Sequence, residues 1–218
     1  MGKLIVIEGL DGSGKSTQVE MLKARLLKEN KNIKQIKLPN YESNSCALVK
    51  MYLGGEFGNK PEDVNAYAAS TFYAVDRFAS FKQIWQEDYN NSETIILADR
   101  YTTSNAVHQM VKLDKSEWEQ YLLWLEDFEY KKLMIPKPDR VIFLDMPVDV
   151  SQKLMTKRYN GDEVKKDVHE SNVEYLKKCR KAVDYAAEKL GWIMIKCAEN
   201  GEPLPFEEIS EMIYKEIF

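Results

Sequence analysis

Two glycines, a lysine and a serine near the start of the chain have the spacing of a phosphate-binding loop. The fixed places of the pattern G-x-x-x-x-G-K-[ST] are filled by Gly9, Gly14, Lys15 and Ser16. The glycines allow backbone N–H groups to turn towards phosphate oxygens, and the N-terminus of a following helix adds positive potential. Lys15 is expected to reach the β- and γ-phosphates, and the Ser16 hydroxyl is expected to hold Mg²⁺. A plain turn between a strand and a helix needs neither side chain, so the segment predicts a nucleotide site.

The residues on either side of this loop support the same prediction. The apolar, β-branched run 5–7 precedes it, as in a buried parallel strand, and the amphipathic run 18–27 follows it. The residues expected to contact ATP are Gly9, Leu10, Asp11, Gly12, Ser13, Gly14, Lys15, Ser16 and Thr17. A GTP-binding switch protein is an alternative from another class, but its guanine specificity needs N-K-x-D after a late strand. The nearest match, 59–62, reads Asn-Lys-Pro-Glu and comes too early.

An aspartate and an arginine stand together at the end of a second apolar run, 95–98. Asp99 closes that run, and a strand-end carboxylate near the metal ion is the expected second half of a P-loop site. The planar guanidinium of Arg100 suits the geometry of a phosphoryl group. We therefore expect Lys15, Asp99 and Arg100 to be catalytic, with Ser16 and Asp99 holding the metal ion.

Strands and helices alternate along the chain and have to position these side chains. We expect strands at 3–8, 33–38, 94–99, 140–145 and 193–197. Helices are expected at about 15–29, 47–53, 64–86, 116–132, 148–157, 171–190 and 206–217, with a cap formed by Asp114 and Glu117. Such alternation implies a three-layer α/β P-loop NTPase fold, a five-stranded parallel sheet with helices on both faces. Ligands then bind at the carboxyl ends of the strands.

The composition is that of an ordinary globular enzyme. The chain has 218 residues, of which 30% are charged and 44% hydrophobic, and its net charge is −4. This balance argues against disorder and against broad nucleic-acid binding. No apolar stretch approaches the roughly 20 residues of a membrane span, and we expect neither a signal peptide nor a membrane partner. The three scattered cysteines, Cys46, Cys179 and Cys197, indicate reduced thiols in a cytoplasmic protein.

Four blocks of sequence together resemble one known family, the thymidylate kinases. They read E-G-L-D-G-S-G-K-S-T-Q at 8–18, F-Y-A-V-D-R-F at 72–78, D-R-Y-T-T-S at 99–104 and K-P-D-R-V-I-F-L-D at 137–145. The blocks keep the family's order and spacing over nearly the whole chain. The resemblance implies one nucleoside monophosphate kinase domain over 1–218 that transfers a phosphoryl group from ATP to dTMP in line, with Mg²⁺. It also implies a homodimer.

The resemblance further implies a set of residues for the dTMP site. This set is Asp11, Tyr41, Phe72, Tyr73, Arg77, Arg100, Ser104, Asn105 and Gln109. Asp11 is expected to bind the 3′-hydroxyl of the deoxyribose, and Tyr73, or its neighbour Phe72, to stack on thymine. Arg77 is expected to donate to the O4 edge of the base, and Gln109 to contact the base as well.

Further positions follow from the same resemblance. Ser104 and Asn105 are expected to crowd the sugar and disfavour a 2′-hydroxyl. The polar stretch 157–167 is similar to the family's lid, which closes over ATP, and Arg158 matches the lid arginine that contacts ATP and serves catalysis. Gly12 stands where some relatives carry a catalytic arginine.

The chain also departs from the family's pattern after the second strand. The family commonly has Phe-Pro-x-Arg there, with an arginine on the acceptor phosphate, but this chain has Leu-Pro-Asn-Tyr ending at Tyr41. Either the Tyr41 hydroxyl contacts the phosphate, or Arg77, Arg100 and a lysine such as Lys50 neutralise it. A related kinase for another deoxynucleotide or a deoxynucleoside is the alternative function. Asp11, Tyr73 and Arg77 favour thymidylate.

Overall fold

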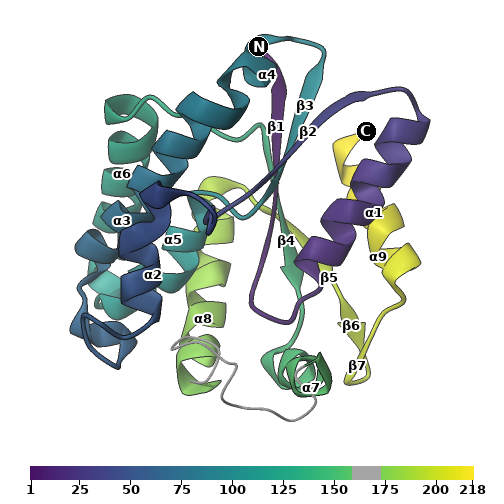
Figure 1. Ribbon diagram of the computed structural model, residues 1–218. Helices are drawn as coiled ribbons and strands as arrows, with labels where there is room; N and C mark the ends of the chain where they lie inside the picture. Colours follow the sequence, from purple (N-terminus) through teal and green to yellow (C-terminus); the bar gives the residue numbers. More distant parts are fainter. Residues whose placement is uncertain (159–172) are drawn as a thin grey trace.

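The computed structural model describes residues 1–158 and 173–218, and it is built around a parallel five-stranded sheet (Figure 1). The strands are β1 (Lys3–Gly9), β2 (Asn32–Lys37), β3 (Thr94–Asp99), β4 (Arg140–Asp145) and β5 (Ile193–Lys196), in the order β2-β3-β1-β4-β5. Each neighbouring pair runs parallel. The expected five-stranded parallel sheet is therefore confirmed, and it places the loop after β1 at the centre of the carboxyl edge.

The strands bury both of their faces, which is why their sequences are continuous apolar runs. Leu4 and Val6 of β1 point to one side of the sheet, into a cluster with Trp85 and Tyr101. The intervening residues of β1, together with Leu97 of β3, pack on the other side. Alternate residues of a strand point to opposite faces, so a parallel sheet covered on both sides needs apolar residues at nearly every position.

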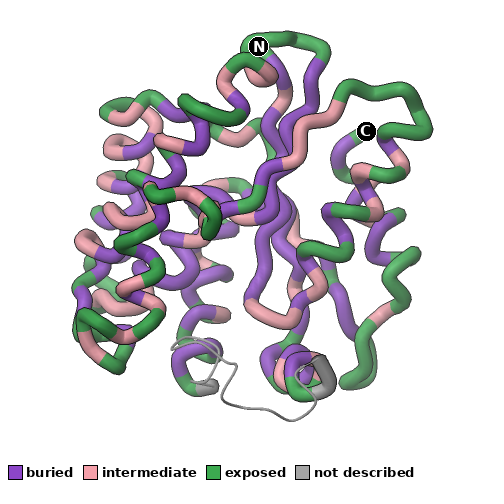
Figure 2. Tube along the Cα trace, viewed as in Figure 1, coloured by how far each residue is buried: buried purple, intermediate pink, exposed green. Residues whose placement is uncertain are grey.

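Helices cover both faces of the sheet. One face is covered by α1 (Lys15–Lys28) and α9 (Phe206–Ile217), which lie side by side (Figures 1 and 2). The other face carries α3 (Ala66–Ser80), α5 (Thr103–His108), α6 (Trp118–Glu126) and α8 (Val173–Leu190). Three further helices, α2 (Ala47–Leu53), α4 (Gln86–Asn90) and α7 (Val148–Arg158), lie around these layers. Within the described residues, no helix is both long and apolar enough to cross a membrane.

Two long helices predicted from the sequence are interrupted by π-helical turns. The helix expected at 64–86 begins at Ala66 and changes to a π-turn at Phe81–Trp85, and the one expected at 116–132 changes to a π-turn at Asp127–Lys132. A π-turn inserts one extra residue into the helical repeat over a single turn, which is too short a segment for a periodicity to reveal. The predicted cap is confirmed, since Asp114 and Glu117 form a capping box.

Shorter elements were not predicted. The six-residue helix α5 and the hairpin of β6 (Ala198–Glu199) and β7 (Glu202–Pro203) are too short to give a periodic signal. Short 3₁₀ turns at Asn44–Cys46, Pro61–Asp63, Met110–Lys112 and Lys115–Glu117 complete the described elements. Of the expected lid, residues 159–167 lie outside the described part of the chain.

The central sheet should dominate the stability of the fold. Leu97→Ala removes a fully buried side chain from β3 and is expected to lower the free energy of unfolding by about 2–5 kcal/mol. Leu27→Ala, on the exposed side of α1, should change it by less than ~0.5 kcal/mol. Urea denaturation followed by circular dichroism measures both, and equal losses would contradict the assigned core.

Candidate active site

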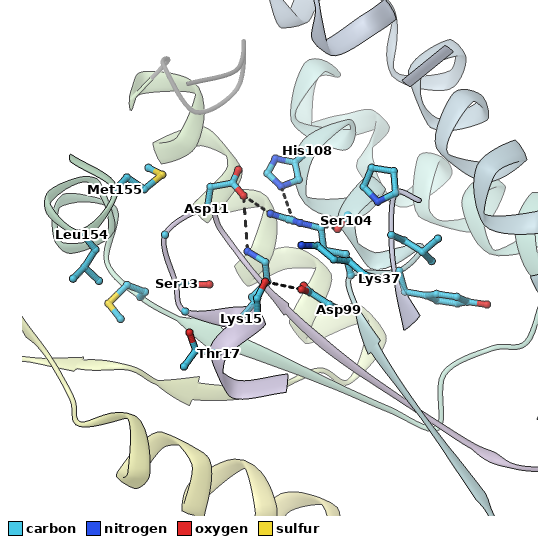
Figure 3. Close-up of a pocket in the computed structure, with 18 of the residues that line it drawn as sticks. Asp11, Ser13, Lys15, Thr17, Lys37, Asp99, Ser104, His108, Leu154 and Met155 are labelled. Carbon is cyan, nitrogen blue, oxygen red and sulfur yellow. Dashed lines mark hydrogen bonds and ion pairs between the residues drawn. The ribbon is translucent and has the colours of Figure 1, made fainter. Parts of the chain in front are cut away.

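A pocket of about 820 Å³ opens at the carboxyl edge of the sheet (Figure 3). It extends from the P-loop towards α3 in one direction and towards the N-terminal end of α9 in the other. The predicted site residues that line it are Asp11, Gly12, Ser13, Gly14, Lys15, Ser16, Thr17, Tyr41, Tyr73, Arg77, Asp99, Arg100, Ser104, Asn105 and Gln109. The fold thus brings nearly all of the predicted residues to one cavity.

The P-loop has the backbone that its glycines predict. Gly12 and Gly14 have φ angles of 78° and 85°, in the left-handed region that favours glycine. The Ser13 hydroxyl is buried and has no hydrogen-bond partner among the described residues. A buried donor without a partner costs free energy, so this hydroxyl is suited to a ligand oxygen.

Lys15 lies across the loop with its ammonium group turned into the cavity. Its Nζ donates to the carbonyl oxygen of Leu10 at 2.9 Å and is 3.9 Å from Oδ1 of Asp11. Burial, and then the charge of Arg100, lower the pKa of Lys15 to about 8, while nearby carboxylates oppose that shift. A phosphate group beside Nζ would add further negative charge and favour the charged lysine.

Gly12 also contacts α7 closely. A Cβ atom built on Gly12 would lie 2.7 Å from the carbonyl oxygen of Ser151 and 2.9 Å from the side chain of Met155. An arginine at this position, as in some relatives, would therefore collide with the helix. The P-loop of this chain therefore has no room for an arginine at position 12 while α7 keeps its place.

Arg100 connects the P-loop with the end of β3. One terminal nitrogen of its guanidinium lies 3.2 Å from Oε1 of Glu8 and 3.3 Å from the Ser104 hydroxyl, and the other donates to Asp11. Its φ angle is 69°, an uncommon conformation for a residue with a side chain. Burial favours a lower pKa for Arg100, but the Asp11, Glu8 and Asp99 carboxylates raise it, so the guanidinium stays charged.

Glu8 is a site residue that the sequence did not predict. Its side chain is 0% exposed. The carboxylate accepts from the Gly9 N–H at 3.0 Å, the Thr103 hydroxyl at 2.9 Å and the Ser104 hydroxyl at 2.7 Å, besides Arg100. Its position could have indicated this role, because a charged residue at the end of a buried apolar strand requires a charged partner nearby.

Ser16 and Asp99 meet where the sequence predicted a metal site. The Ser16 hydroxyl donates to Oδ2 of Asp99 at 2.7 Å, and both residues line the pocket beside the P-loop. Hydroxyl and carboxylate oxygens are the ligand types that Mg²⁺ uses together with water and phosphate. The donor set therefore fits this ion.

The two aromatic candidates on α3 differ in position. Tyr73 lines the pocket, whereas Phe72 packs against Phe57 and Tyr52 with ring centroids 5.6 and 6.3 Å apart. Phe72 is absent from the residues that line the cavity in the described part of the chain. Gln109 reaches the same end of the pocket, and its buried amide oxygen has no described hydrogen-bond partner.

Arg77 lines the pocket but is already paired within the protein. Nε and Nη2 donate to the carboxylate of Glu129 at 2.7 and 2.6 Å. A buried arginine needs an anionic or acceptor partner. Glu129 fulfils that need, so burial of Arg77 alone does not require a substrate.

The loop after β2 is held in place by the acid next to Arg77. Asp76 accepts from the Asn40 N–H at 2.8 Å and from the Ser45 hydroxyl at 2.7 Å. Tyr41, 46% exposed, and Lys37 both line the pocket in front of this loop, but Lys50 lies exposed on α2 and is not among the lining residues. Lys37 was missed, although its place at the end of β2 could have indicated it.

His108 is a second pocket residue without a predicted role. Its Nε2 is 3.4 Å from a terminal nitrogen of Arg100 (Figure 3). Its Nδ1 is 3.8 Å from the Sγ of Cys179. With Ser104 and Asn105, it makes the short helix α5 one wall of the site.

The other end of the pocket is apolar. Leu154 of α7, Leu204 and Phe206 line it, and the Gln18 amide donates to the carbonyl oxygen of Phe206 at 2.9 Å. This contact fixes the start of α9 against α1. Arg158 is the last residue of α7, and its side chain is outside the described part of the chain.

Comparison with known proteins identifies the family. The family model described as thymidylate kinase matches residues 7–209. A thymidylate kinase of Mycobacterium tuberculosis is 29% identical over 149 residues, 68% of each chain. A probable thymidylate kinase of Methanosphaera stadtmanae is 31% identical over 176 residues, covering 79% of this chain and 82% of that one. A probable thymidylate kinase of Thermococcus gammatolerans is 28% identical over 220 residues, covering 100% and 98%.

A solved structure agrees at the level of the fold. The thymidylate kinase of Candida albicans superposes with a TM-score of 0.71 and covers 99% of this chain and 91% of its own, at 21% sequence identity. The family match spans the P-loop, α3, the Asp99–Arg100 pair and β4, which are the elements that build the pocket. The chain therefore belongs to the thymidylate kinase family of phosphotransferases, which phosphorylate dTMP.

Proposed function

We propose that the pocket holds ATP at its P-loop and α9 end and dTMP at its α3 and α5 end. The observation that carries this assignment is the convergence of Lys15, Arg100 and Asp11 between the two ends. The acceptor phosphate and the γ-phosphoryl group then meet beside two cations. A coupled ADP-release assay with dTMP, dUMP, dCMP, dGMP and thymidine tests the acceptor; a preference for an acceptor other than dTMP would refute the proposal.

The chemistry at that meeting point is positioning and neutralisation of charge. An oxygen of the dTMP phosphate attacks the γ-phosphorus in line, and ADP leaves. Because this oxygen is already anionic, the enzyme needs no strong general base. Lys15 and Arg100 stabilise the charge that spreads over the transferred group, and Arg158 adds to them as the family resemblance implies.

Mg²⁺ is the metal that the Ser16 and Asp99 oxygens would hold. When bound, this ion neutralises phosphate charge and orients the phosphate oxygens. The remaining P-loop residues bind the phosphates of ATP through backbone N–H groups.

Recognition of dTMP is assigned to residues of three elements. Asp11 binds the 3′-hydroxyl of the sugar, and Ser104 and Asn105 crowd the 2′ position. Tyr73 stacks on thymine, an assignment that its place in the pocket supports over Phe72. Arg77 donates to O4 of the base. Gln109 contacts the base as well, and its unpartnered amide oxygen supports this role.

We further propose a cytoplasmic homodimer. All three cysteines are free thiols, which fits a reducing compartment. Val75 and Phe78 expose apolar side chains one helical turn apart on the outer side of α3. A second copy of the chain packed on α3 would remove these side chains from water.

Lys15 provides the first test of the donor site. Lys15→Ala removes the ammonium group beside the β- and γ-phosphates and is expected to lower kcat by at least ~10³-fold. Lys28→Ala, at the exposed far end of the same helix, should leave the rate unchanged. Steady-state kinetics measures both, and more than a tenth of wild-type activity in Lys15→Ala would refute the assignment.

The two pocket arginines should fail in different ways. Arg100→Ala removes charge stabilisation in the transition state, so we expect kcat to fall by roughly 10²–10³-fold. Arg77→Ala removes a contact that is similar before and during the reaction, so it should mainly raise the KM for dTMP. Both variants leave a buried carboxylate without its arginine, so thermal denaturation has to show folded protein first. The assigned roles are contradicted if both variants change kcat and the KM for dTMP alike, or if Arg77→Ala mainly lowers kcat and Arg100→Ala mainly raises the KM.

Lys37 and Tyr41 together should take the place of the missing arginine. Lys37→Ala is expected to raise the KM for dTMP about tenfold, the scale of one charge-assisted hydrogen bond. Tyr41→Phe should raise it roughly fivefold, the scale of a neutral one. Lys50→Ala is the matched control, because Lys50 lies outside the pocket lining, and its KM should equal that of the wild type. If Lys37→Ala and Tyr41→Phe leave the KM for dTMP unchanged and Lys50→Ala raises it, the assignment is wrong.

A further inference from the structure

Glu129 is a fully buried carboxylate directly behind the acceptor end of the pocket. It is 0% exposed and stands in the middle of the π-helical turn Asp127–Lys132. The neighbouring acid Asp127 instead faces outward and pairs with Lys131 and Lys132, each at 3.6 Å. The π-turn thus directs one acid of this segment into the protein, where its charge requires partners.

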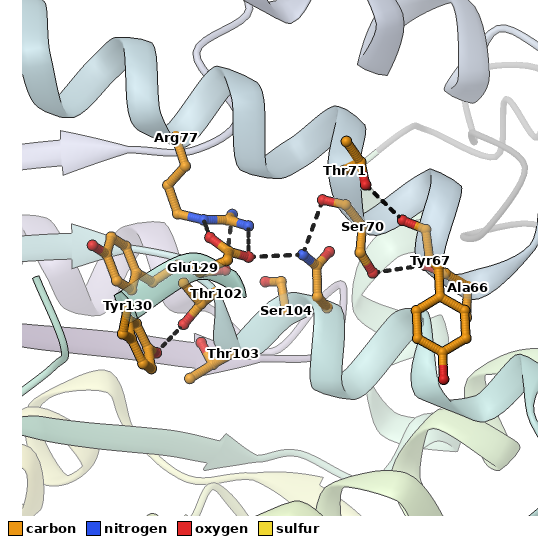
Figure 4. Close-up of polar contacts among 12 residues, drawn as sticks. Ala66, Tyr67, Ser70, Thr71, Arg77, Thr102, Thr103, Ser104, Glu129 and Tyr130 are labelled. Atoms are coloured by element: carbon orange, nitrogen blue, oxygen red, sulfur yellow. Dashed lines mark hydrogen bonds and ion pairs between the residues drawn. The ribbon is translucent and has the colours of Figure 1, made fainter. Parts of the chain in front are cut away.

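Those partners are two residues that line the pocket. Arg77 donates from Nε and Nη2 to the two carboxylate oxygens at 2.7 and 2.6 Å, which is the bidentate geometry of a strong pair (Figure 4). Asn105 donates from Nδ2 to Oε1 at 3.2 Å. Glu129 therefore holds a residue of α3 and a residue of α5 at the same time.

These contacts decide which groups face the cavity. A guanidinium has five N–H donors. Arg77 uses two on Glu129 and one on the Tyr101 carbonyl oxygen at 3.3 Å, which leaves one on each terminal nitrogen. Both N–H groups of Asn105 are used, on Glu129 and on the Ser70 carbonyl oxygen at 3.4 Å, so its amide oxygen remains as an acceptor. The pocket is thus offered a donor from Arg77 beside an acceptor from Asn105.

This polarity matches one class of pyrimidine. Thymine presents an acceptor at O4 and a donor at N3–H, whereas cytosine presents a donor at its N4 amino group and an acceptor at N3. We propose that Glu129 is a positioning residue that sets the hydrogen-bond polarity of the acceptor-base end, so that a 4-keto pyrimidine is accepted and a 4-amino pyrimidine is rejected. This inference rests on the proposed placement of dTMP at the α3 end.

Glu129→Gln tests the polarity with little change in shape. The new amide places N–H groups where one of the two carboxylate oxygens accepted. In either orientation these groups meet a donor of Arg77, and in one orientation they also meet the Asn105 amide, so the contacts that hold the two residues are lost. We expect the ratio of kcat/KM for dTMP to kcat/KM for dCMP to fall by ~10–100-fold, which is the discrimination that hydrogen bonds to one base edge provide. The kcat at saturating dTMP should stay within about threefold of the wild type, since the residue acts on binding.

Glu126→Gln is the matched control. Glu126 lies one turn earlier in the same segment and pairs with Lys137 at the surface. Its neutralisation should leave the dTMP to dCMP ratio unchanged. A fall of the ratio in both variants would overturn the proposal.

A purely structural ion pair gives a different result. In that case folded Glu129→Gln loses thermal stability but keeps the base preference, and the proposal is wrong. Where Glu129→Gln does not fold, Glu129→Asp keeps the buried charge and leaves Arg77 in place, but its shorter side chain cannot hold Arg77 and Asn105 at the same time. Loss of the base preference in that variant supports the proposal, and retention overturns it. Absence of dTMP phosphorylation in the wild type would instead refute the proposed function.

Discussion

The active site depends on the pairing of charges that the fold has taken out of water. Arg100, at the end of β3, is held between Glu8 of β1 and Asp11 of the P-loop. An isolated charge in such a place costs several kcal/mol, so each member of the set requires the others. The pairing joins two neighbouring strands to the phosphate-binding loop. A guanidinium anchored in this way needs little reorganisation when phosphate arrives, which is the property that electrostatic catalysis requires.

The same principle recurs at the acceptor end with different elements. There Arg77 on α3 is held by Glu129, which reaches it from the turn after α6. Both arginines have a buried carboxylate behind them and pocket space in front. Two arginines that line one cavity are thus fixed by the protein before either substrate binds, so binding spends less free energy on ordering them.

The sequence predicted the parts of the site whose chemistry is local. Asp99 and Arg100 stand next to each other at a strand end, and Gly14, Lys15 and Ser16 follow one another in the loop, so spacing alone located them. Glu129 and His108 could not be located in this way, because their roles arise from contacts across the fold. Glu129 also lies in a π-turn, which redirects side chains over one turn and is too short for the hydrophobic pattern to reveal. Lys37 was overlooked because a lysine at a strand end usually points to solvent.

The contact between Gly12 and α7 limits how this chain can evolve. A larger residue at that position collides with the carbonyl oxygen of Ser151, part of the backbone of α7. The gain of an arginine in the P-loop is therefore not a single-step change, because α7 has to shift at the same time. The residue at position 12 and the position of α7 are therefore coupled, and a change in one requires a change in the other.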